Sequence, residues 1–131
     1  MANISAYAEA AMLNWILLGA TPTRPGTNAV GLSLGNPSSI SGSEMTTGVG
    51  YTRQTVGFNS VATAGFATNT NAMTFGPFSS AYSITGLQIW DTILTLNSGS
   101  MLWYGTLATA RTMAIGDSLV IASGQLSCTL G

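Results

Sequence analysis

The chain has 131 residues, with three Arg, four acidic residues, one Cys and no Lys or His. This length suits one domain that buries a core without metal or disulfide support. The shortage of basic residues excludes electrostatic binding of nucleic acid, and the lack of His excludes the usual catalytic triads and zinc or copper sites. We therefore expect no catalytic residue, no metal and no cofactor.

Charged residues make up only 5% of the chain, against about 25% in an average domain. Monomeric proteins normally carry surface charge that keeps molecules apart. The deficit therefore predicts that part of the surface is covered in an assembly. The alternative is a neutral surface, rich in Thr, on an all-β domain.

The first segment is predicted to be a helix that ends at Gly19, with Asn3 or Ser5 as its N-cap. Ile16 and Leu17 add apolar surface beyond a single face, so the helix packs either on its own domain or on another subunit. The predicted apolar face consists of Ile4, Ala8, Ala11, Met12, Trp15 and Leu18.

The apolar run at 10–20 has no basic residue before it and is too short to span a bilayer. We expect no signal peptide and no membrane contact. Residues 21–26 contain Pro22 and Pro25 and read as an extended linker. The expected division is a helix and linker over 1–26 and a single β domain over 27–131.

After the linker the pattern indicates seven or eight short strands separated by turn signals, which is typical of an antiparallel β-sandwich of the jelly-roll or immunoglobulin type. A step in the apolar pattern predicts a bulge at Gly86. Leu126, Cys128 and Leu130 should face the core, and Gln125, Ser127 and Thr129 should face away. The predicted strands are 29–34, 51–58, 71–75, 82–90, 101–107, 111–115, 119–122 and 126–130.

The motifs that resemble chemical sites are weak. The Gly48-Val49-Gly50 loop lacks the Lys and the helix of a phosphate-binding loop. Asp91 and Asp117 read as turn residues more than as a pair of catalytic carboxylates. Trp90, Trp103 and Tyr104 fit core packing, a subunit interface or sugar stacking.

The three Arg residues can each pair with a carboxylate inside the domain or across a subunit boundary, and the sequence does not choose between these alternatives. The candidate interface residues are Met12, Trp15, Leu18, Arg24, Arg53 and Trp103.

Several segments resemble a family of small virion structural proteins of tailed bacteriophages, whose members are labelled tail fibre or virion proteins. Besides the N-terminal helix, Arg24-Pro25 and Ser43-Glu44, they are GLSLGNPSS from Gly31, GYTRQ from Gly50, ATNTNAMTFGPF from Ala67, GLQIWD from Gly86, MLWYGTL from Met101 and GDSLVIASGQLSCTL from Gly116. The resemblance implies a β-rich module of a virion, made in the host cytoplasm.

The first hypothesis is a non-enzymatic capsid decoration (cement) protein. It would form a homotrimer and bind another virion protein such as the major capsid protein, because interface cores are depleted of charge. The alternatives are a tail fibre or tail-tip module and a carbohydrate-binding module. Neither nucleic acid nor membrane is an expected partner.

Overall fold

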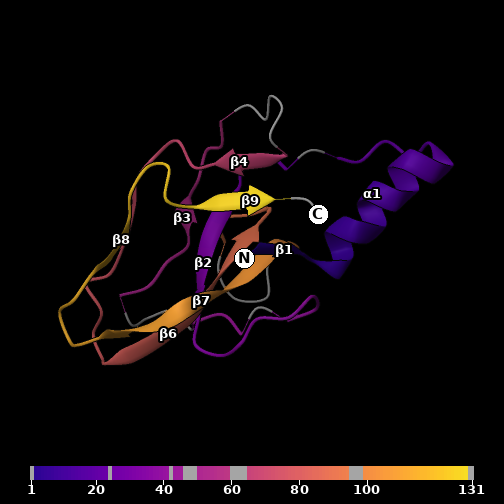
Figure 1. Cartoon of the computed structure of the whole chain (residues 1–131). Coiled ribbons are helices and arrows are strands. Elements are labelled where there is room, and N and C mark those ends of the chain that lie inside the picture. Colours follow the sequence, from indigo (N-terminus) through magenta and orange to yellow (C-terminus); the bar gives the residue numbers. More distant parts are fainter. Residues whose placement is uncertain are drawn as a thin grey trace.

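The computed structural model describes residues 2–23, 25–41, 43–45, 50–59, 65–94 and 99–129. Within these residues the chain is mainly β, with one N-terminal helix and nine strands (Figure 1). The sequence predicted this class of fold, with one helix and seven or eight strands. In chain order the elements are β1 (Ala2–Ile4), α1 (Ala6–Leu18), β2 (Ala29–Ser33), β3 (Gln54–Thr55), β4 (Phe66–Thr68), β5 (Met73–Phe75), β6 (Tyr82–Trp90), β7 (Met101–Met113), β8 (Leu119–Ile121) and β9 (Ser127–Thr129).

The strands form a five-stranded antiparallel sheet in the order β1-β7-β6-β2-β3 and two small antiparallel sheets, β4-β9 and β5-β8. One buried cluster joins all three sheets: Leu32 of β2 and Ile84 of β6 pack with Phe75 of β5 and Cys128 of β9. This arrangement confirms the predicted antiparallel, sandwich-like fold.

Local signals at both ends of α1 act as predicted. The Ser5 hydroxyl accepts a hydrogen bond from the Ala8 N–H at 3.2 Å, and Gly19 adopts φ 69° while its N–H donates to the Asn14 carbonyl. Ile4 was expected on the helix but lies in β1, where it is opposite Trp103 of β7. In the described part of the chain, no helix is long and apolar enough to cross a membrane.

Strand β1 ties residues 2–4 into the large sheet, at its outer edge next to β7. The segment expected to stand before the β domain therefore starts within that sheet and leaves it at Ser5. The expected boundary at residue 26, between the linker and the β domain, stays a prediction.

Strands β6 and β7 form the centre of the large sheet. β6 has the predicted bounds, and its register shifts between Ile84 and Gly86, which confirms the predicted bulge. Ile84 is opposite Arg111 and Gly86 is opposite Thr106, so four residues of β7, 107–110, lie opposite the single residue Thr85 of β6. A Cβ at Gly86 would lie 2.7 Å from the Gly105 carbonyl oxygen, which explains the glycine.

Two predictions about strand bounds were wrong. The segments 101–107 and 111–115 form one strand, β7, because both halves pair with β6 in the same direction. The predicted strand 51–58 shrinks to β3, and just before it Tyr51 and Arg53 are buried on either side of the exposed Thr52. The alternation ends there, since Thr55 is exposed and Val56 is buried. Strand β4 was not predicted.

The C-terminal alternation is confirmed where the structure describes it. Leu126 and Cys128 are buried, while Gln125 and Ser127 are exposed. Thr129, which was expected to face away from the core, is half-buried. Leu130 lies outside the described residues.

Candidate functional site

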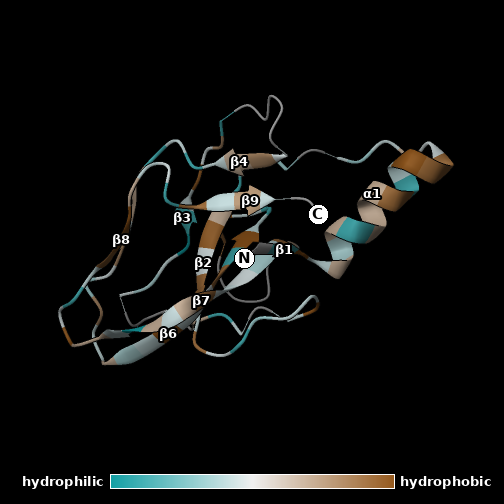
Figure 2. Ribbon diagram, in the orientation of Figure 1, coloured by the Kyte–Doolittle hydropathy of each residue, from teal (hydrophilic) through white to brown (hydrophobic). Residues whose placement is uncertain are grey.

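Helix α1 exposes an unusual amount of apolar surface. It stands away from the sheets and carries hydrophobic residues over much of its length (Figure 2). Ala8 is its buried residue, and the exposed fraction reaches 78% at Leu18. A helix that is apolar on all sides is normally buried. The large hydrophobic residues of α1 that are more than half exposed are Tyr7, Leu13, Trp15, Ile16, Leu17 and Leu18.

The start of α1 is fixed to the body by hydrogen bonds. The Ser5 hydroxyl donates to the Met101 carbonyl, and the Ser5 N–H donates to the Leu102 carbonyl at 2.9 Å. The Ala6 N–H donates to the Ser39 carbonyl at 3.0 Å. These bonds hold the first turn at the beginning of β7, and the rest of the helix projects outward (Figure 1).

Three of the candidate interface residues belong to this region of the chain. Trp15 and Leu18 are exposed and Met12 is half-buried, whereas Ala8 of the predicted apolar face is buried and Ile4 lies in β1, so only the later part of that face is open to another molecule. Arg24 lies outside the described residues. An intersubunit role for these four residues stays a prediction.

The structure removes Arg53 from the candidate interface. Its side chain is buried and forms a two-point ion pair with Glu44, with Nε to Oε1 and Nη2 to Oε2 both at 2.7 Å. Nη1 donates to the carbonyls of Thr92 at 3.1 Å and Leu94 at 2.6 Å. Of the two alternatives left by the sequence, pairing within the domain is the correct one for this residue.

Tyr51 completes this buried cluster. Its hydroxyl donates to Glu44 Oε1 at 2.7 Å, and burial, followed by the bond to Glu44, raises the pKa of the Tyr51 phenol well above its usual range. Trp90 belongs to the cluster too, because Arg53 lies over its ring and its Nε1 donates to Gln88 Oε1 at 2.9 Å. Trp90 therefore has a structural role.

The two acidic residues that the sequence places at turns both accept a hydrogen bond from a backbone N–H. Asp91 Oδ1 accepts from the Ser100 N–H at 2.7 Å, and Asp117 Oδ2 accepts from the Ala114 N–H at 2.9 Å. The prediction that Asp117 is a turn residue is confirmed. Among the described residues, no group of three His, Cys, Asp or Glu side chains comes together. The loop at Gly48 and Val49 lies outside these residues.

An apolar pocket of about 310 Å³ lies between the small β4-β9 sheet and the large sheet. Two of its lining residues, Asn28 and Trp103, each carry a buried polar atom, Oδ1 and Nε1, that has no hydrogen-bond partner in the described part of the chain. None of the described residues that line it is charged. The main contributors are Phe66 and Ala67 of β4, Ile89 of β6, Leu102 and Trp103 of β7, and Cys128 of β9.

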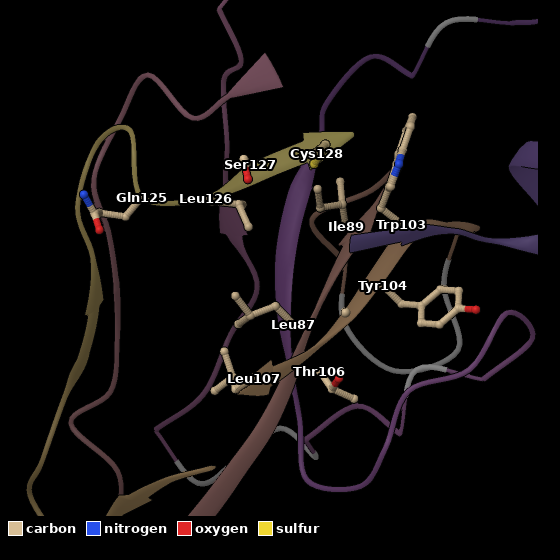
Figure 3. Close-up of a pocket in the computed structure, with 11 residues that line it drawn as sticks. Leu87, Ile89, Trp103, Tyr104, Thr106, Leu107, Gln125, Leu126, Ser127 and Cys128 are labelled. Carbon is tan, nitrogen blue, oxygen red and sulfur yellow. The ribbon is translucent and has the colours of Figure 1, made fainter. Parts of the chain in front are cut away.

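A smaller pocket of about 180 Å³ adjoins the first and shares Ile89, Trp103 and Cys128 with it. Figure 3 shows Leu87 and Leu126 pointing into this smaller space, while Trp103 points away from them. Burial raises the pKa of the Cys128 thiol to about 12. The thiol between the two pockets is therefore protonated at neutral pH.

A comparison with known protein families shows to which family the chain belongs. The family described as Podophage GP4 fiber I protein gp80 matches residues 3–129. The chain belongs to this family. The resemblance to small phage virion proteins is confirmed, and membership in the fiber I family supports a structural role in a phage particle. No curated protein gives a match.

The apolar pocket of this fiber I family member has no signal in the sequence. Its walls come from strands that are far apart in the chain, and β4 had no predicted strand. Trp103 was singled out as an aromatic residue, but nothing in the local sequence pairs it with Asn28 or Phe66.

Proposed function

We propose that this protein is a structural subunit of a fibre on a phage particle. It acts without catalysis, by binding copies of itself and a neighbouring virion protein through apolar contacts. The description of its family favours a fibre over the capsid decoration role, which is the first hypothesis from the sequence. The virion is its expected location.

The exposed apolar helix carries this proposal. The six large side chains of α1 that are more than half exposed offer on the order of 700 Å² of surface. A specific interface buries roughly 800 Å² on each partner. Because these side chains lie all round the helix, neighbouring molecules have to cover α1 on more than one side to bury this area.

Substitution of the helix surface tests self-association. The double variant Ile16→Glu/Leu17→Glu should run as a monomer in analytical ultracentrifugation, while the wild-type chain forms oligomers. Both positions are well exposed, so far-ultraviolet circular dichroism should stay unchanged. The matched control is Ile115→Glu, at an exposed turn position, which should assemble like the wild type. Oligomers of undiminished size from the double variant would contradict the proposal.

Counting copies in purified particles tests the fibre role. A fibre subunit should be present in a small multiple of the rotational symmetry of the tail, and gold-labelled antibody should bind at that end of the particle. A decoration protein should instead approach the copy number of the major capsid protein. Quantitative mass spectrometry distinguishes the two outcomes.

A further inference from the structure

We propose that the bulge at residues 107–110 of β7, together with Arg111, keeps strands of other molecules from adding to the open edge of the five-stranded sheet. The two features act against association at this edge, so that copies meet only through other surfaces. This inference does not depend on the proposed role of α1.

The second half of β7 is an edge of the large sheet. β7 is 13 residues long, and β6 lies along one side of it. On the other side β1 pairs only with Trp103, Tyr104 and Gly105, near the beginning of β7 (Figure 1). Beyond Gly105, none of the described strands lies on this side. In the described structure, β7 therefore has a free edge from Thr106 onward.

The sequence of this edge suits pairing with another strand. A row of unpaired N–H and C=O groups is a template to which an extended chain can add, and natural sheets protect such edges with charges, proline or bulges. Residues 101–110 contain neither a charged residue nor proline, and the whole chain has no Lys. Uncharged segments that favour strands assemble readily when an edge exposes them. Protection of β7 must therefore come from its shape and from the one charge that follows, Arg111.

The bulge disrupts the middle of this edge. A regular ladder that continues from the pair of Gly86 and Thr106 would place Ile84 opposite Ala108, but Ile84 is opposite Arg111. β7 thus contains three residues more than β6 requires. Residues 108–112 are all exposed, so the alternation of a strand that lies flat on a core is lost. Because a bulge bends and twists its strand, the N–H and C=O groups here do not form the straight row that an added strand needs.

Arg111 adds a charge at the end of the bulge. Residues directly opposite each other in a ladder point to the same face of the sheet, and its partner Ile84 is buried in the core. Arg111 therefore lies on the core-facing side, although it is itself exposed. It forms no ion pair with a described residue. A strand added beside β7 would take this guanidinium out of water without a counter-charge, which opposes association.

Both features suit a chain in which charge is scarce. With charged residues at 5% of the chain, repulsion between like charges gives the surface little protection. A bulge blocks the addition of a strand through geometry and needs no charge. Copies held close together in a particle would otherwise be free to join edge to edge.

Removal of the extra residues tests the bulge. Deletion of Ala108, Thr109 and Ala110 leaves the pairs of β6 and β7 on both sides in place, because it makes the register continuous. The deletion is made in the Ile16→Glu/Leu17→Glu background, so that contacts through α1 do not contribute. We expect the shortened chain to form concentration-dependent β-sheet assemblies, detected by thioflavin T fluorescence and light scattering, while the background chain gives no signal.

Two controls separate an opened edge from a weakened fold. Deletion of Thr109 alone shortens the chain but keeps a bulge, so it should give no assemblies. Thr106→Lys, at an exposed position of the edge, should suppress assembly of the chain that lacks residues 108–110. A shortened chain that unfolds cooperatively in urea and yet stays free of assemblies would overturn the inference. Assemblies from both deletions, or assemblies that Thr106→Lys does not affect, would show general destabilisation and overturn it as well.

Substitution of Arg111 gives a test in the full-length chain, which does not depend on the folding of the deletion variant. In the same background, Arg111→Thr should assemble at a lower protein concentration than Arg111→Lys, which retains the charge. If the deletion variant does not fold, this comparison decides, and equal behaviour of the two variants overturns the inference. A background chain that still forms oligomers, without thioflavin T fluorescence, would instead count against the proposed function and leave this comparison intact.

Discussion

Arg53 lies over the indole ring of Trp90, with its guanidinium carbon 4.0 Å from the ring centroid, while the same guanidinium pairs with Glu44. Because this cation is fully buried, its loss of a counter-charge is costly. We expect Glu44→Gln to lower the free energy of unfolding by about 3–5 kcal/mol, measured by urea denaturation. Replacing both partners, as Glu44→Gln/Arg53→Met, should recover part of the loss. A change below about 0.5 kcal/mol, which is usual for a surface position, would contradict a stabilising role.

Ser5→Ala should loosen the attachment of α1. The substitution removes the N-cap of the helix and the bond to the Met101 carbonyl. Loss of an N-cap costs about 1 kcal/mol. Hydrogen exchange should therefore become faster in the first turn of α1, while Ser79→Ala, at an exposed loop position, should leave it unchanged. Equal exchange in both variants would show that the cap does not hold the helix.

Cys128 should react slowly with thiol reagents at pH 8 and rapidly in denaturant. Burial raises the pKa of its thiol from 9.0 to about 12, so the thiolate that reacts is scarce in the folded chain. Fast labelling of the native protein would refute the buried position.

The same pKa shift predicts how stability depends on pH. Between pH 9 and pH 12 the unfolded thiol has lost its proton while the folded thiol retains it. The free energy of unfolding should therefore be unaffected by this group below pH 9 and should fall as the pH rises toward 12. The Cys128→Ala variant should show a smaller decline in a series of denaturant titrations. Identical declines in the two proteins would contradict this prediction.

Local signals accounted for the elements that the sequence predicted well. The N-cap at Ser5, the stop at Gly19 and the bulge at Gly86 each depend on residues within a few positions. The alternation that buries Leu126 and Cys128 is equally local. Short strands were missed because they form through distant partners: β1 pairs with β7, and β4 pairs with β9.

The candidate site divides in the same way. An excess of apolar residues over one helical face was visible in the sequence, and Leu17 and Ile16 are indeed exposed. The pairing of Arg53 with Glu44 was not visible in the sequence, because an arginine can pair equally well with a carboxylate of its own domain or with one of a neighbouring subunit. Only the fold brings Asn28 close to the pocket that Trp103 lines.

The absence of charged side chains from the last two turns of α1 has a consequence for the conditions under which the proposed subunit contact holds. Dissolved ions weaken attractions between exposed charges, with a screening length of about 10 Å at 0.1 M. Dissolved ions do not screen an apolar contact in this way, and salts such as sulfate strengthen hydrophobic association. We expect the proposed contact between subunits to persist from low to high salt concentration. It should weaken on cooling, because the hydrophobic contribution is smaller at low temperature.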